Sequence, residues 1–206
     1  MAYTEFQLIK EIFAPLATSK FALGLKDDVA VMPPRAGRDL VLKTDTIVEG
    51  IDFFPDDPPA TIGKKALRVN LSDLAAKGAE PVGYLLTLAL RRNVRVEWLR
   101  KFAHGLADDQ RKFKLALLGG DMSATPGPLT ISIAAFGYVP SGAVILRSGA
   151  RPGDLVFVSG TVGDSGGGLE ALTKKSSRPA LISRYRVPEP RLALGRRLRG
   201  LASAAL

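Results

Sequence analysis

Residues 69–81 run Val69-Asn70-Leu71-Ser72-Asp73-Leu74-Ala75-Ala76-Lys77-Gly78-Ala79-Glu80-Pro81, between an apolar run at helical spacing and a second apolar run typical of a buried strand. Asn70 and Asp73 are three positions apart, so they lie on one face of the predicted helix, beside its apolar stripe. A lone helical aspartate most often caps a turn or accepts a backbone N–H. Three other acidic turns, however, favour a role that Asp73 shares with them. These turns are Lys26-Asp27-Asp28, Thr44-Asp45-Thr46 and Gly119-Gly120-Asp121.

The composition limits the class of protein. The chain has 206 residues, of which 46% are hydrophobic, enough to fill the core of a large domain. No apolar run reaches the ~18 residues of a membrane-spanning helix, and the N-terminus lacks a signal-peptide pattern, so we expect a soluble cytoplasmic protein. The lack of cysteine excludes disulfides and thiolate chemistry, and the single histidine, His104, excludes a multi-histidine zinc site. We interpret His104 as a structural or surface residue.

The positive charge is concentrated near the C-terminus. The formal net charge is +9, and residues 171–206 contribute +8 of it, from nine basic side chains against Glu189 alone. Such a tail could bind RNA, but Tyr185 is the only aromatic residue there on which a base could stack. The preferred interpretation is a solvated helical face, and nucleic-acid binding is the weaker alternative.

Apolar periodicity predicts alternating helices and strands. Helical spacing covers residues 5–16, 61–77 and 94–113, and a last basic helix follows Pro190. We expect Thr61 to cap the second of these helices, and Gly78 with Pro81 to end it. Strand patterns cover residues 29–32, 39–48, 82–90, 114–118 and 129–139, and an apolar run over 155–158 leads into a strand-to-helix turn at 160–169.

The acidic turns carry the chemical prediction. In the strand over 39–48, Asp45 is flanked by the hydroxyls of Thr44 and Thr46. The adjacent carboxylates of Asp27 and Asp28 repel each other unless they are solvated or share a cation. Ligand sets made of oxygen atoms alone favour magnesium, which binds through a few carboxylates together with substrate phosphates. These residues by themselves predict a magnesium–nucleotide site and name neither the acceptor nor the reaction.

Two glycine-rich turns could approach a phosphate. Gly119-Gly120 before Asp121 permits positive φ and brings backbone N–H groups close to a ligand oxygen, although the same triplet is also an ordinary turn. The run at 160–169 lacks the lysine and spacing of a Walker A loop and does not match Gly-x-Gly-x-x-Gly. For this second turn, structural and functional interpretations have equal weight.

Longer motifs give a specific resemblance. They occur in the order Glu5-Phe6-x-Leu8-Ile9, Asp27-Asp28-Val29-Ala30-Val31, Thr44-Asp45-Thr46-Ile47-Val48-Glu49-Gly50, Lys65 through Pro81, Leu118-Gly119-Gly120-Asp121 and Leu146 through Asp154. In this combination the chain resembles the thiamine-monophosphate kinases, of the aminoimidazole-ribonucleotide-synthetase-like superfamily, over essentially its whole length. The resemblance implies an α+β fold. Residues 1–140 would form the N-terminal domain, a mixed sheet or half-barrel with flanking helices that dimerises with the same domain of a second chain. Residues 141–206 would form the start of a second α+β domain.

The resemblance also implies an activity. In this reaction the γ-phosphoryl group of ATP is transferred to thiamine monophosphate, which forms thiamine diphosphate. Several magnesium ions take part, and no side chain acts as a covalent nucleophile. The expected partners are ATP, thiamine monophosphate and a second copy of the chain, without membrane or nucleic acid, and the nucleotide lies near the dimer interface. By similarity the metal positions are Asp28, Thr44, Asp45, Asp73 and Asp121, with Asp27 and Thr46 alongside; the ATP positions are Gly120, Asp121 and Arg147.

The chain departs from the family pattern at a few positions. Lys26 replaces a glycine before the aspartate pair, and Met122-Ser123-Ala124 replaces Thr-Thr-Arg after Asp121. Asp52 stands where the family has a histidine that contacts the thiamine substrate, so it is the candidate substrate-binding residue. The family also continues past the position of Leu206, so we expect the chain to turn over poorly by itself.

Two other functions remain open. One is a different ATP-using member of the superfamily, such as a hydrogenase-maturation dehydratase, a purine-pathway ligase or a selenophosphate synthetase. The lack of cysteine argues against the last of these. The other is a catalytically incomplete module that binds nucleotide, or RNA through the basic tail, and whose RNA affinity would fall steeply with salt.

Overall fold

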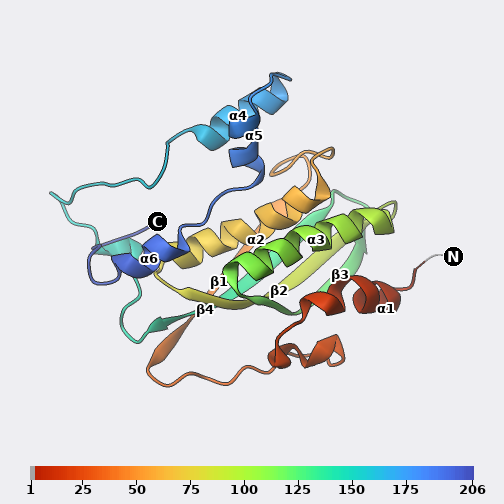
Figure 1. Cartoon of the computed structure of the whole chain (residues 1–206), viewed down its shortest axis with the longest axis horizontal. Coiled ribbons are helices and arrows are strands. Elements are labelled where there is room, and N and C mark those ends of the chain that lie inside the picture. Colours follow the sequence, from red (N-terminus) through yellow and green to blue (C-terminus); the bar gives the residue numbers. More distant parts are fainter. Residues whose placement is uncertain (1–2) are drawn as a thin grey trace.

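A computed structural model describes residues 3–206, and its centre is a four-stranded mixed sheet (Figure 1). The first two residues of the expected domain 1–140 lie outside the described residues. The strand order is β1-β4-β2-β3; β4 pairs antiparallel with β1 and β2, and β2 pairs parallel with β3. The predicted α+β class is confirmed. The strands are β1 Arg38–Val48, β2 Glu80–Arg91, β3 Ala116–Thr125 and β4 Thr130–Pro140.

Two long helices, α2 Pro59–Ala76 and α3 Val96–Phe113, cover one face of the sheet (Figure 1). Because β2 and β3 are parallel, the chain must cross over between them, and α3 makes that crossover. The predicted cap is wrong: α2 begins at Pro59, and the Thr61 hydroxyl donates to the carbonyl of Pro58 instead of accepting an N–H. The described part of the chain contains no helix long and apolar enough to cross a bilayer.

The predicted N-terminal helix is present but irregular. It consists of α1 Glu5–Leu8, a π-helical turn η1 Ile9–Phe13 and a 3-10 turn η2 Ala14–Leu16. Thr4 and Gln7 form a capping box, which satisfies the backbone N–H groups of these two residues. Beside the sheet, this segment adds three residues to the core, Ile12, Phe13 and Leu16.

The predicted strand over 29–32 is wrong. After the 3-10 helix η3 Lys20–Leu25, the chain runs without regular structure to β1. Val29 and Val31 are exposed, and the Val31 N–H bonds to the carbonyl of Phe21 at 3.0 Å. Strand-forming residues need a partner strand to satisfy their backbone groups, and this segment passes outside the sheet.

The C-terminal region is made of short helices around an extended segment. They are η4 Arg147–Gly149, α4 Asp164–Thr173, α5 Pro179–Arg186 and α6 Leu192–Leu198. The turn at 160–169 leads into α4, and the last basic helix is α6, as predicted. The apolar run over 155–158 forms no strand in the described structure, and its side chains are 64–92% exposed.

A buried ion-pair network ties the C-terminal region to the helices. The Arg68 guanidinium donates to both carboxylate oxygens of Asp109 at 2.7 and 2.8 Å, and to Glu189 at 3.0 Å. Lys112 also binds Glu189, at 2.9 Å. Burial by itself lowers the pKa of Arg68, but the carboxylates of Asp109 and Glu189 raise it, and the resulting pKa is above the ordinary value. The network therefore joins α2, α3 and the segment after α5.

The buried phenol of Tyr84 should make stability depend on alkaline pH. Tyr84 is fully buried on β2, and Gln110 donates to its hydroxyl at 3.3 Å. Burial raises the pKa of Tyr84 well above its ordinary value, because the phenolate would lose its solvation. The folded protein keeps a proton that the unfolded chain releases above about pH 10, so this contribution is complete below that pH and is lost as the pH rises.

We therefore expect a Tyr84→Phe variant to lose stability less steeply than the wild type between pH ~10 and ~11. Urea unfolding at a series of pH values measures the slope. When the wild type unfolds in this pH range, Tyr84 becomes free to ionise, so the tyrosinate absorbance should rise by a further step. Equal slopes for both proteins would show that Tyr84 ionises in the folded state.

Candidate functional site

Strand β1 and helix α2 bring two predicted metal ligands together around a lysine. Lys43 and Asp45 are two apart on β1 and share its helix-facing side. The Lys43 ammonium lies 3.1 Å from Oδ1 of Asp45 and 2.6 Å from Oδ2 of Asp73. The hydrogen bond to Asp73 raises the pKa of Lys43; partial burial opposes this and Asp45 adds to it. Both carboxylate side chains remain accessible, at 40% and 46% exposure.

Two further cations lie at the C-terminal end of α2. Lys77 follows Asp73 by four positions, one helical turn further along. Its ammonium donates to the carbonyl of Ala205 at 2.8 Å, and its own carbonyl accepts the N–H of Ile145. Burial lowers the pKa of Lys77, and the nearby Arg147 charge lowers it further. We call this group the helix-side cluster, and its members are Lys43, Asp45, Asp73, Lys77 and Arg147.

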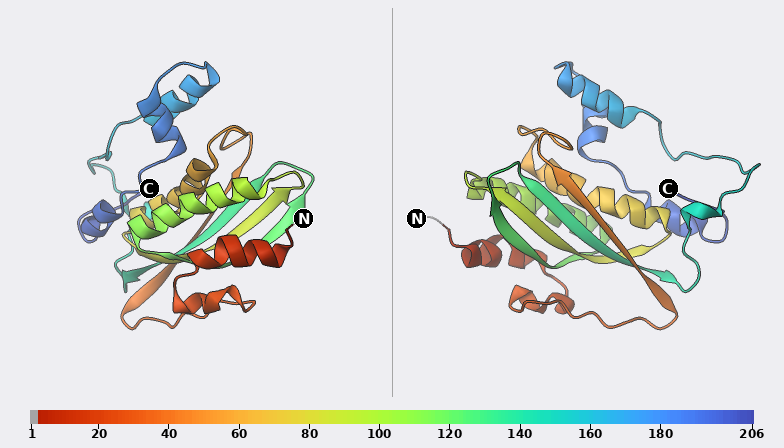
Figure 2. Two further views of the ribbon diagram at one scale, coloured as in Figure 1. Left: turned by 45° about the vertical axis from the view of Figure 1, so that its right-hand side comes forward. Right: turned by 180° about the vertical axis from the view of Figure 1, so that it is seen from behind.

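Other predicted ligands lie on the opposite face of the sheet. The strand registers pair Thr46 with Ser132, Ser132 with Thr87, and Thr87 with Asp121. These four polar residues form a line across the sheet that we call the open-face row, and Thr46 donates to Ser132 at 3.0 Å. Thr44 is two residues before Thr46 and shares that face. Seen from behind, the strands lie in front of α2 and α3 (Figure 2, right), so the row is not covered by these helices.

The glycines before Asp121 do not form the predicted turn. Gly119 and Gly120 lie inside β3, and neither has positive φ. A Cβ on Gly120 would overlap the carbonyl oxygen of Leu86 on β2. The local requirement for glycine is therefore close packing of two strands beside a register irregularity. The role of Gly120 in ATP binding stays a prediction.

The predicted metal residues do not form one compact site. Asp27 and Asp28 are exposed in the irregular segment before β1. Among residues 3–206, no three acidic or histidine side chains come close enough to hold a metal ion together. Magnesium, however, commonly uses one or two carboxylates and completes its shell with water and phosphate oxygens. The carboxylates of Asp45 and Asp73 fit that requirement, provided that the Lys43 ammonium can move away.

The predicted substrate residue, Asp52, supports a loop. Its carboxylate accepts the N–H of Val48 at 2.8 Å, and its carbonyl accepts the Tyr185 hydroxyl at 3.0 Å and the Lys65 ammonium. Asp73 is eight positions after Lys65 on α2, which is about 12 Å along the helix. Asp52 thus lies near the other end of α2 from the helix-side cluster.

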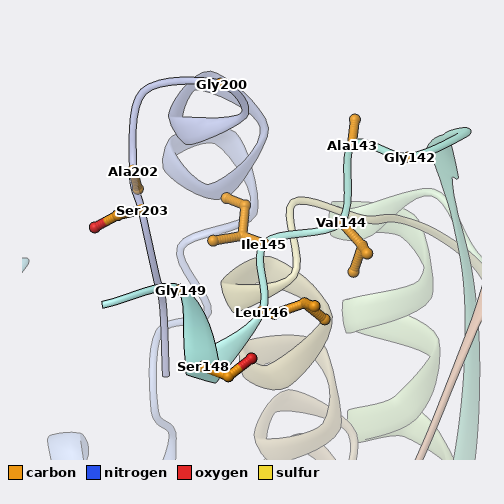
Figure 3. A pocket seen from close by; sticks show the side chains of 10 residues that line it. All are labelled: Gly142, Ala143, Val144, Ile145, Leu146, Ser148, Gly149, Gly200, Ala202 and Ser203. Carbon is orange, nitrogen blue, oxygen red and sulfur yellow. The ribbon is translucent and has the colours of Figure 1, made fainter. Parts of the chain in front are cut away.

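A shallow hollow of about 420 Å³ lies between the segment that carries Arg147 and the C-terminal segment (Figure 3). Small and apolar residues dominate its lining, which includes Ile145 and Leu146 from one segment and Ala202 from the other. Arg147 itself does not line it. The hollow therefore lacks the charged groups that a phosphate would need.

The sequence prediction missed two members of the helix-side cluster, Lys43 and Lys77. Spacing could have identified both. Lys43 is two residues before Asp45 on a strand, and Lys77 is four residues after Asp73 at the end of a helix. Each lysine therefore projects from the same side of its element as a predicted metal ligand.

Comparison with known proteins gives a consistent set of relatives. Residues 26–139 match the family model described as AIR synthase related protein, N-terminal domain. A thiamine-monophosphate kinase of Caulobacter vibrioides is 44% identical over 205 residues, which are 98% of this chain.

Solved structures agree with these relatives. The crystal structure of the thiamine-monophosphate kinase of Stenotrophomonas maltophilia K279a matches 99% of this chain and 67% of its own, with a TM-score of 0.84 and 37% identity. AaThiL complexed with AMPPCP and TMP matches 99% of this chain and 66% of its own, with a TM-score of 0.78 and 33% identity. The chain spans 58% of the length of the Caulobacter relative.

Proposed function

Because the chain belongs to the family of AIR synthase related proteins, and within it to the thiamine-monophosphate kinases, we propose that it takes part in phosphorylating thiamine monophosphate to thiamine diphosphate with ATP and magnesium. The observation that carries this proposal is the helix-side cluster. It combines two accessible carboxylates, suited to magnesium, with lysine and arginine side chains suited to phosphate.

The residues of the cluster have complementary roles in this proposal. Asp45 and Asp73 hold a magnesium ion, and a bound magnesium ion neutralises phosphate groups that would otherwise repel each other. Lys77 and Arg147 bind phosphate oxygens, and the planar guanidinium of Arg147 can do so through two parallel hydrogen bonds. No side chain forms a covalent intermediate, since positioning and charge neutralisation supply most of the catalysis of phosphoryl transfer.

We also propose that the open face of the sheet pairs with a second copy of the chain. Leu42 is 64% exposed there, and its neighbour in the register is the half-buried Phe136. Pairing would cover these apolar side chains and place the open-face row, which includes Asp121, at the interface, across the sheet from the nucleotide site proposed at the helix-side cluster. Sedimentation equilibrium tests this proposal, and a monomer at all protein concentrations would contradict it.

The test of the reaction uses γ-labelled ATP with magnesium and a panel of acceptors. We expect the label to appear in thiamine diphosphate when thiamine monophosphate is the acceptor, and not with unphosphorylated thiamine or a nucleoside monophosphate. We further propose slow turnover by the 206-residue chain, because it spans only 58% of the Caulobacter relative and 67% of the Stenotrophomonas structure. Rapid turnover would contradict that second proposal, and a preference for another acceptor would contradict the first.

A further inference from the structure

One ammonium group occupies the position between two candidate metal ligands. The Lys43 ammonium contacts one carboxylate oxygen of Asp45 and one of Asp73, at 3.1 and 2.6 Å. In the described part of the chain, the ion pairs of both carboxylates are with Lys43. The two acids come from different elements, β1 and α2, and would repel each other without a cation between them. Lys43 therefore supplies the charge that a metal ion would otherwise supply.

We propose that Lys43 is a positioning residue that holds the Asp45–Asp73 pair together before metal binding and must leave it when a divalent ion enters. This inference rests on the proposed function, because it takes that pair as the metal site. A magnesium ion bound to both acids would use the same oxygen atoms and would repel the ammonium. Metal and lysine thus compete for the pair.

The competition couples metal binding to nucleotide binding. The displaced ammonium sits on a flexible four-carbon chain and needs a new anionic partner. A phosphate that arrives with the metal provides one, whereas magnesium alone does not. Lys43 therefore weakens the binding of free magnesium and does not weaken the binding of magnesium with ATP to the same extent.

The test is calorimetric titration of magnesium chloride into the chain without nucleotide. We expect Lys43→Met to bind magnesium about tenfold more tightly than the wild type, which corresponds to the loss of two partly exposed ion pairs. Lys43→Arg keeps the competing charge and should bind as weakly as the wild type. Lys64→Met is the matched control, because Lys64 pairs with Asp108 at 2.7 Å and has a similar exposure.

Two further measurements separate this inference from misfolding and from the proposed function. Circular dichroism must show that Lys43→Met is folded, and adding Asp73→Asn to it should remove the gain in magnesium affinity. Unchanged or weaker magnesium binding by Lys43→Met, including no binding by either protein, would overturn the inference. If ATP binding still required magnesium in that case, the proposed function would stand and only the role of Lys43 would fail.

Discussion

Replacing Asp73 with asparagine is expected to weaken the binding of ATP with magnesium by about 100-fold or more. Substituting residues that merely support metal ligands already costs about 10- to 100-fold in metal affinity, and Asp73 is proposed as a ligand itself. The amide removes a negative charge from a pair that lies within 4 Å of the same cation, Lys43. Isothermal titration with ATP at saturating magnesium measures the change.

The control for this variant is Asp108→Asn. Asp108 is also a partly exposed aspartate paired with a lysine, but it lies on α3 and pairs with Lys64, away from the cluster. We expect its ATP affinity to equal that of the wild type. Because partly exposed ion pairs contribute little to stability, Asp73→Asn should remain folded. Equal affinities in both variants would exclude Asp73 from the site.

Replacing Arg68 with methionine is expected to lower the free energy of unfolding by about 3–5 kcal/mol. The side chains of Arg68 and Asp109 are 8% and 1% exposed, so the substitution leaves the Asp109 carboxylate buried without its partner. Methionine fills much of the same space, which keeps the loss of packing small. Urea unfolding measures the change, and proteolysis should become faster near Glu189, which loses one of its two cationic partners.

Two variants show whether the buried charge causes this effect. Arg100→Met removes an ion pair with Glu11 in which both side chains are 43% exposed, and it should cost at most about 1 kcal/mol. Combining Arg68→Met with Asp109→Asn should recover part of the loss, because the buried charge is then absent. Equal losses for Arg68→Met and Arg100→Met would contradict the proposed importance of burial.

Much of the sheet and helix pattern could be predicted from periodicity. The strand expected over 39–48 is β1 Arg38–Val48, and the helix expected over 94–113 is α3 Val96–Phe113. Both have a buried side that the sequence reveals through regular apolar spacing. Periodicity did not fix the start of α2, where Pro59 rather than Thr61 begins the helix.

Partner strands and close packing could not be predicted in the same way. The runs over 29–32 and 155–158 are apolar enough for strands, but in the described structure neither run pairs with a neighbouring strand. Apolar composition measures the tendency to be buried, whereas a strand also requires backbone partners that come from distant parts of the chain. Gly119-Gly120-Asp121 likewise favours a turn in the sequence, whereas the contact of Gly120 with Leu86 depends on the pairing of β2 with β3.

The sequence points to three members of the helix-side cluster, Asp45, Asp73 and Arg147, but it does not give the arrangement of the cluster in space. Alternation along β1 puts Lys43 and Asp45 on one face of the strand, but only the packing of β1 against α2 brings them to Asp73. The same packing separates Thr44, Thr46 and Asp121 from that group, because the sheet lies between them. A set of ligands read as one site along the sequence is therefore divided between two faces.

The central claim is that the carboxylates of Asp45 and Asp73, brought together by β1 and α2, form a magnesium–nucleotide site. The most direct test is calorimetric titration of ATP into the wild-type chain. One titration contains magnesium and the other contains a chelator. We predict saturable binding with magnesium and none without it, since the phosphates need a cation between them and the carboxylates of Asp45 and Asp73. ATP binding of equal strength with the chelator, or no binding in either titration, would contradict the account.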